Sequence, residues 1–138
     1  MALTVEDRLN IDQLYSTYVR RIDYHDPSGW AQLFTPDGRW QMFMGDETEP
    51  TLEVHGRDAI AEFARKDNEL RKGSTRHWTV NLLVDGDGTT ATGYCYGYRL
   101  DVSGGQTRIE VYGDYEDELV QIDGEWLFAR RMLRVPVA

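Results

Sequence analysis

Cysteine is almost absent from this sequence, which has Cys95 alone among 138 residues. One cysteine excludes an internal disulfide and suits a reducing compartment. The first residues lack a basic stretch followed by an apolar segment, so we expect no signal peptide. No apolar run approaches membrane-spanning length. These absences favour a cytoplasmic protein.

Positive charge is also scarce, with 15 Lys and Arg against 24 Asp and Glu and a formal net charge of −9. This excess of acidic residues repels phosphate backbones and anionic lipid. We therefore expect neither nucleic acid nor a membrane surface as a partner. The densest acidic stretch, residues 46–49, predicts a solvated loop.

Motifs for metal ions and nucleotides are missing. His25, His55 and His77 show no metal-ligand spacing among themselves or with Cys95. No phosphate-binding glycine loop and no Gly-x-Ser-x-Gly elbow is present. We expect no metal and no organic cofactor, which leaves acid–base chemistry by side chains. Stoichiometric tightly bound zinc or iron in elemental analysis would contradict this expectation.

The first half of the chain has helical periodicity. Apolar residues recur at helical spacing between Ile11 and Ile22, after a capping-box start at Thr4 and Asp7. Residues 26–27, Asp followed by Pro, predict the start of a second short helix. We expect that helix to carry Trp30, Leu33 and Phe34, a short strand to cover residues 39–44, and a third helix to cover residues 58–71.

The second half alternates with period two, which predicts strands at residues 74–84, 89–102, 106–122 and 125–135. Asp123-Gly124 is a two-residue hairpin signal. Helices followed by long strands indicate an α+β fold, in which three helices pack against a curved, mainly antiparallel sheet. Such a layout encloses a cone with a mouth. The length and the absence of a linker or repeat predict one domain over residues 1–138.

His77 is the first candidate for chemistry. Strict alternation groups it with Thr79 and Asn81 on one face of its strand, and sets Trp78, Val80, Leu82 and Val84 on the other. The polar face is either solvent-exposed or the floor of a cavity. His77 is accordingly either a surface histidine or a general base, since imidazole titrates near neutral pH.

Two further candidates lie in the first helix. Asp23 falls in the last turn, where a carboxylate meets the negative end of the helix dipole. It is either a turn residue or the partner of a cation. Tyr18 is central in the apolar stripe and is either a core aromatic or a functional hydroxyl. Several large residues elsewhere either line a pocket or belong to the core: Trp40, Met42, Met44, Trp126 and Phe128.

The order of several short segments resembles the SnoaL-like superfamily. These segments are residues 18–23, Asp26-Pro27, Trp30, residues 33–34, 36–37, 55–60, His77 with Asn81 and Asp85, residues 90–93, Tyr115, Asp123-Gly124, Trp126 and Phe128. The superfamily is shared with nuclear transport factor 2, scytalone dehydratase, steroid isomerase and limonene epoxide hydrolase. The resemblance implies the cone-shaped α+β fold, and it transfers fold better than activity.

Within the superfamily, the chain is most similar to the cofactor-free lyases: scytalone dehydratase, bile-acid dehydratase and hexachlorocyclohexane dehydrochlorinase. Their catalytic aspartate and histidine fall on Asp23 and His77, and the tyrosine of the bile-acid enzyme falls on Tyr18. Met42 stands where steroid isomerases carry a base, and Asp101 stands near the second histidine of scytalone dehydratase. The resemblance therefore favours an Asp–His lyase and disfavours a steroid-type isomerase.

The resulting hypothesis is a dehydratase-type lyase that acts on a small apolar cyclic metabolite. We expect His77, Asp23 and Tyr18 to be catalytic, and Trp40, Met42, Asn81 and Tyr115 to bind substrate. Cyclisation or isomerisation on the same dyad is one alternative. A non-catalytic binding or assembly subunit, like the β subunit of ring-hydroxylating dioxygenases, is another. The strands with two apolar faces predict a homodimer or homotrimer.

Overall fold

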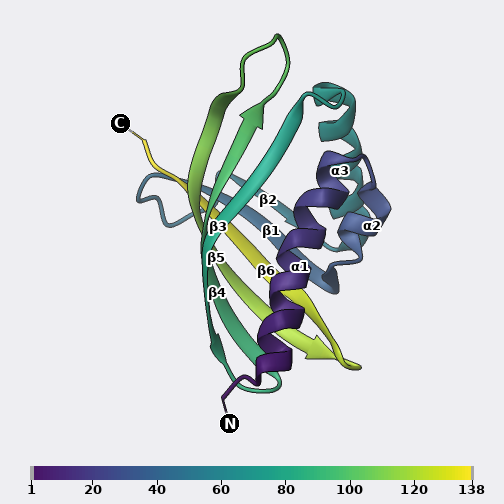
Figure 1. Cartoon of the computed structure of the whole chain (residues 1–138), viewed down its shortest axis with the longest axis vertical. Coiled ribbons are helices and arrows are strands. Elements are labelled where there is room, and N and C mark those ends of the chain that lie inside the picture. Colours follow the sequence, from purple (N-terminus) through teal and green to yellow (C-terminus); the bar gives the residue numbers. More distant parts are fainter. Residues whose placement is uncertain (1, 138) are drawn as a thin grey trace.

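The fold is a curved six-stranded sheet with three helices packed on one of its faces (Figure 1). The computed structural model describes residues 2–137. The elements are α1 (Val5–Asp23), α2 (Pro27–Ala31), β1 (Phe34–Met44), β2 (Leu52–His55), α3 (Arg57–Arg71), β3 (Thr75–Gly86), β4 (Thr90–Asp101), β5 (Arg108–Ile122) and β6 (Glu125–Val135). The predicted α+β fold is confirmed.

The sheet has the strand order β2-β1-β6-β5-β4-β3. All neighbouring strands are antiparallel except β1 and β6, which are parallel. The sheet does not close on itself, so its concave side needs the helices as a cover, and α1 lies across it in contact with β3 and β6. Within residues 2–137, no helix combines the length and apolar character needed to cross a membrane.

Local sequence signals set several boundaries as predicted. The Thr4 side chain accepts a hydrogen bond from the Asp7 N–H at 3.0 Å, and Asp7 accepts one from the Thr4 N–H at 2.9 Å. This capping box starts α1. At the other end of the chain, Asp123 and Gly124 have φ values of +51° and +81°. Both residues therefore adopt the left-handed conformation that a tight β5–β6 hairpin requires.

The start of β1 differs from the prediction, because α2 ends at Ala31 and Leu33 and Phe34 are not helical. Phe34 pairs with Phe128 of β6, and the Phe128 N–H donates to the Leu33 carbonyl at 2.8 Å. This pairing joins residues far apart in the chain, so helical spacing cannot reveal it. The short strand β2, which pairs with β1, was likewise not predicted.

A bulge in β3 overturns the predicted alternation. The register with β4 shifts between Val80 and Leu83, and Asn81 has a φ of +58°. An extra residue on one strand reverses which face each later side chain occupies. Leu82 and Val84 consequently pack against the core rather than sharing a face with Trp78, while Asn81 is exposed.

The outer face of the sheet carries large exposed hydrophobic side chains on β3, β4 and β5: Trp78, Leu83, Tyr94, Tyr96, Ile109 and Tyr112. Contiguous apolar surface of this kind marks a protein contact. We expect a homodimer or homotrimer that buries this face. Light scattering at micromolar concentration is the measurement, and a monomer there would contradict the prediction.

Candidate active site

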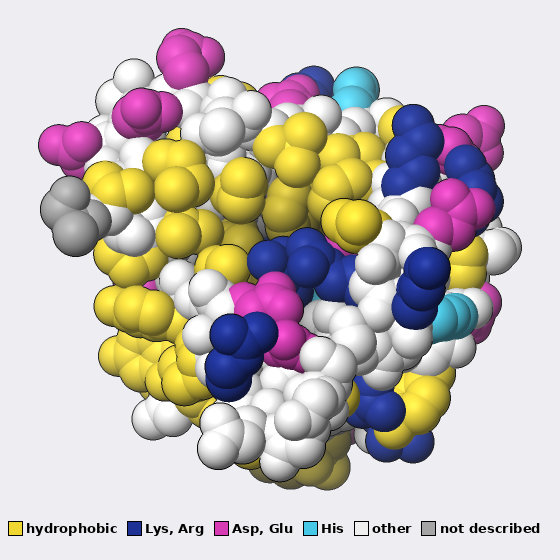
Figure 2. Space-filling model, turned by 90° about the horizontal axis from the view of Figure 1, so that it is seen from above, with side chains coloured by type: hydrophobic (Ala, Val, Ile, Leu, Met, Phe, Trp, Pro, Cys, Tyr) yellow, Lys and Arg dark blue, Asp and Glu magenta, His cyan; other side chains and the backbone are white. Residues whose placement is uncertain are grey.

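A cavity of about 340 Å³ opens between the helices and the concave side of the sheet. Viewed from this end of the molecule, hydrophobic side chains surround a hollow, and basic and acidic side chains lie together along its border (Figure 2). Most of the wall is apolar, with contributions from α1, α2, α3 and five strands. The lining polar or ionisable side chains include Tyr18, Asp67, His77, Thr79, Arg99 and Tyr115.

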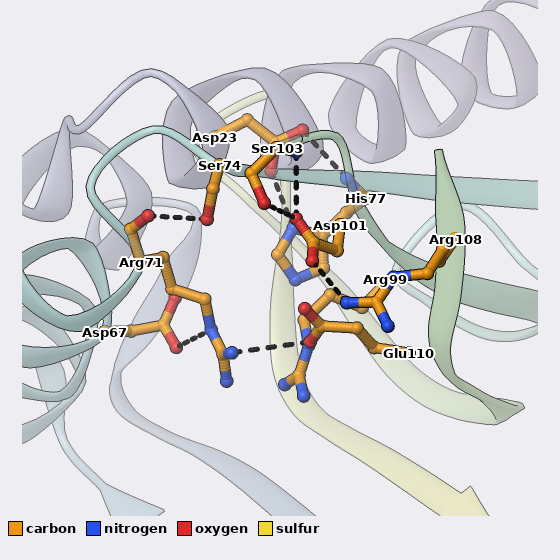
Figure 3. Close-up of polar contacts among 10 residues, drawn as sticks. All are labelled: Asp23, Asp67, Arg71, Ser74, His77, Arg99, Asp101, Ser103, Arg108 and Glu110. Carbon is orange, nitrogen blue, oxygen red and sulfur yellow. Dashed lines mark hydrogen bonds and ion pairs between the residues drawn. The ribbon is translucent and has the colours of Figure 1, made fainter. Parts of the chain in front are cut away.

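His77, which lines this cavity, contacts Asp23, although 54 positions separate the two residues in the chain. The His77 Nδ1 lies 2.6 Å from the Asp23 Oδ1, and the His77 backbone N–H donates to the Asp23 Oδ2 at 2.9 Å (Figure 3). Asp23 is the last residue of α1, and α1 packs on β3, which carries His77. Both carboxylate oxygens thus hold one histidine at two points.

This contact selects the tautomer of His77. An ionised carboxylate can only accept hydrogen bonds, so the Nδ1 carries the proton. The Nε2 then has an unshared electron pair, and it has no hydrogen-bond partner within residues 2–137. Because His77 lines the cavity, its Nε2 is available to a bound molecule. The two contacts with His77 also offset the unfavourable place of the Asp23 carboxylate at the helix C-terminus.

Tyr18 also lines the cavity, and Trp40 fixes its hydroxyl. The Trp40 Nε1–H donates to the Tyr18 hydroxyl oxygen at 3.1 Å. The Tyr18 proton has no acceptor in the described part of the chain. Burial raises the pKa of Tyr18 well above its ordinary value. The hydroxyl therefore stays protonated at neutral pH and can donate a hydrogen bond into the cavity.

The structure separates the other expected site residues into two groups. Trp40, Met42 and Tyr115 line the cavity, as does Met44. Asn81 does not, because the β3 bulge turns this residue outward, and its expected role in substrate binding is withdrawn. Trp126 and Phe128 are buried in the core and are not part of the cavity wall.

Sequence reasoning missed a buried ion pair beneath the cavity floor. The Arg131 Nε donates to the Asp117 Oδ1 at 3.1 Å, and both side chains are fully buried. Tyr15 donates to the other carboxylate oxygen at 2.5 Å. The guanidinium carbon of Arg131 lies 4.2 and 3.8 Å from the ring centroids of Tyr18 and Tyr115. One feature of the sequence could have revealed this pair. Asp117 lies two positions after Tyr115, so alternation places both on the same, inward face of the strand, and a charged residue at such a core position needs a partner.

Gly97 shapes the cavity wall. A Cβ at this position would lie 2.2 Å from the Tyr115 Cε2. We expect Gly97→Ala to force the Tyr115 ring into the cavity and to lower the free energy of unfolding by about 1–3 kcal/mol. Urea denaturation measures this cost. Gly88→Ala, where a Cβ would meet nothing within 4 Å, is the control, and equal stability of the two variants would contradict the prediction.

Within residues 2–137, no three His, Cys, Asp or Glu side chains form a group that could hold a metal ion. That the protein needs no metal and no organic cofactor stays a prediction.

Comparison with solved structures identifies the same architecture repeatedly. A Mycobacterium tuberculosis protein of unknown function is 31% identical, with a TM-score of 0.80 over 94% of this chain and 71% of that one. A protein from Novosphingobium aromaticivorans, described as a candidate scytalone dehydratase, is 25% identical, with a TM-score of 0.81 over 96% and 86%. A Nostoc punctiforme protein of unknown function with a cystatin-like fold is 21% identical, with a TM-score of 0.84 over 98% and 95%.

No curated protein matches the sequence. The model of the SnoaL-like domain matches residues 3–132, which is nearly the whole chain. That family includes polyketide cyclases and dehydratases. The fold, the strand order and this match agree, and the chain belongs to the SnoaL-like domain family.

Proposed function

We propose that this protein is a cofactor-independent lyase that removes water from a small, mostly apolar cyclic compound. One observation carries the proposal: Asp23 holds the Nδ1 of His77, and the Nε2 of His77 has no partner within residues 2–137 at a largely apolar cavity. A neutral imidazole with one free nitrogen in such a site is suited to general-base catalysis.

The proposed reaction starts at a carbon acidified by a neighbouring carbonyl. The His77 Nε2 takes the proton, and the C–H electron pair forms the new double bond while the C–O bond to the leaving hydroxyl breaks. Asp23 stabilises the imidazolium, as the carboxylate of a catalytic triad does. Tyr18 donates its proton to the departing oxygen, which leaves as water. The proton on His77 then returns to Tyr18 through the solvent.

The shape of the site supports a substrate of this kind. A volume of about 340 Å³ is at the lower end of the range for small-molecule sites, and its walls are largely hydrophobic. A ring compound such as a polyketide, steroid or terpenoid intermediate fits this description. The Novosphingobium relative, described as a candidate scytalone dehydratase, is consistent with an elimination of this type.

A cavity filled with aromatic side chains, together with a His77 that points to solvent, would indicate a non-catalytic subunit. Here the cavity is open and the His77 side chain is 20% exposed and paired with Asp23. These features favour the enzyme.

The test is an elimination assay with cyclic β-hydroxyketones, followed by the absorbance of the conjugated enone. Isomerisation or cyclisation on the same dyad would give products without loss of water, which mass spectrometry distinguishes. We expect enone formation that depends on His77. A panel of such rings that the wild-type protein leaves unchanged, or turns over equally well without His77, would refute the proposal.

A further inference from the structure

Arg99 is the one arginine or lysine among the described residues that line the cavity. It is the direct partner of His77 across β3 and β4. Paired residues on neighbouring antiparallel strands have Cβ atoms about 5 Å apart and project from the same face of the sheet. Gly97, two positions earlier on β4, also lines the cavity. The Arg99 side chain therefore lies beside the proposed base, on the cavity side of the sheet.

One edge of the Arg99 guanidinium is already held in place. Its Nε donates to the Glu110 Oε2 at 3.0 Å. The same oxygen accepts from Arg71 at 3.4 Å, and Arg71 also pairs with Asp67 at 3.2 Å. Figure 3 shows Glu110 as the link between Arg71, at the end of α3, and the strand that carries Arg99. This network orients the guanidinium at the rim of the cavity.

The other edge of the guanidinium has no protein partner. Neither terminal nitrogen of Arg99 makes a hydrogen bond within residues 2–137, and the side chain is 29% exposed. A guanidinium presents two parallel N–H donors that match the two oxygens of a carboxylate. The remaining wall is largely apolar, and its carboxylate, Asp67, pairs with Arg71 rather than with Arg99. The two terminal nitrogens are therefore free to donate to the oxygens of a ligand.

We propose that Arg99 is a specificity-determining residue that binds a carboxylate on the substrate. The substrate would then be an apolar ring that carries a carboxylate, with the ring in the cavity and the carboxylate at its rim, next to His77. This inference rests on the proposed function for the identity of the site, and it narrows the substrate class. Glu110 orients Arg99 through the Nε, and its negative charge repels a carboxylate bound at the terminal nitrogens.

Binding of a matched pair of ring compounds tests the proposal. The probes are β-naphthoate and β-naphthamide, which share shape and apolar area and differ in charge. Quenching of the fluorescence of Trp30 and Trp40, which line the cavity, reports binding. We expect the wild-type protein to bind naphthoate about tenfold tighter than naphthamide, because a charge-assisted bidentate contact forms only with the acid.

Three variants test whether Arg99 causes the preference for naphthoate. Arg99→Gln should reduce the ratio of the two dissociation constants to about one and leave the affinity for naphthamide within about twofold. Arg108→Gln removes the same charge from a residue that pairs with Asp101 outside the cavity wall, and it should keep the preference. Glu110→Gln should strengthen naphthoate binding, because the amide oxygen can still accept from the Arg99 Nε while the charge that repels the ligand carboxylate is gone.

His77→Gln tests whether the neighbouring imidazole, rather than Arg99, causes the preference for naphthoate. We expect this variant to keep the preference. A preference that disappears with His77→Gln, or that survives Arg99→Gln, would overturn the proposal. So would the absence of naphthoate binding at millimolar concentration in both the wild-type and Glu110→Gln proteins. These measurements need no turnover. An Arg99-dependent preference in a protein without elimination activity would refute the proposed function alone, and His77-dependent elimination without the preference would refute this inference alone.

Discussion

Replacement of Asp23 by asparagine is expected to lower the turnover number by about 10²–10⁴-fold, the contribution typical of general acid–base catalysis. The asparagine oxygen can still accept from the His77 backbone N–H, so its NH2 group faces the Nδ1 of His77. The Nδ1 must then accept rather than donate, which moves the imidazole proton to the Nε2 and removes the base from the cavity. The elimination assay measures this loss.

His77→Ala removes the base outright and is expected to abolish turnover. The double variant should be scarcely slower than His77→Ala alone, because residues that act as one unit are strongly non-additive. If the two losses instead multiplied, Asp23 would act independently of His77, and the proposed mechanism would be wrong.

Melting curves give an independent reading of the Asp23→Asn variant. The retained bond to the His77 backbone and the removal of a charge from the helix C-terminus should keep the change in unfolding free energy within about 1 kcal/mol. A variant that melts far below the wild-type protein and keeps full activity would make Asp23 a structural residue, and the lyase proposal would fail with it.

The largest loss of stability is expected at the buried ion pair. Arg131→Met should lower the free energy of unfolding by about 3–5 kcal/mol, because it leaves the Asp117 carboxylate buried without its cation. Arg131 and Asp117 are both fully buried, so water cannot replace the lost partner. Urea denaturation at pH 8 is the measurement. Arg39→Met is the matched control, since Arg39 pairs with Glu53 at the surface, and it should cost less than about 1 kcal/mol.

Acid should relieve the Arg131→Met defect. Burial raises the pKa of Asp117 to about 6 even with Arg131 present. Loss of the cation raises it further. A carboxyl whose pKa is higher in the folded protein contributes stability at low pH, which is lost as the pH rises through the folded-state value. The variant should therefore lose less stability, relative to wild type, at pH 5 than at pH 8.

A second substitution checks the same point. Asp117→Asn in the Arg131→Met background should recover part of the lost stability at pH 8, because the amide carries no charge and can still accept from Tyr15. A cost of Arg131→Met that is independent of pH and unchanged by Asp117→Asn would show that lost packing, rather than the unpaired charge, causes the defect.

The sequence by itself determined the features that depend on neighbours in the chain. The capping box at Thr4 and Asp7 satisfies free N–H groups within one helical turn. Asp123 and Gly124 form a hairpin because their own backbones tolerate positive φ. The order of helices and then strands predicted the α+β class, and family resemblance singled out Asp23, His77 and Tyr18.

Tertiary structure alone decided the features that depend on pairing between distant segments. Phe34 joins a strand because β6 lies beside it. A bulge in β3, which no local pattern predicted, turns Asn81 out of the cavity. The same strand register sets Arg99 opposite His77, and packing of β5 against β6 brings Asp117 to Arg131. Period-two alternation says which residues share a face within one strand. It contains no information on which strands are neighbours or where a register shifts, and those are set by the packing of the whole chain.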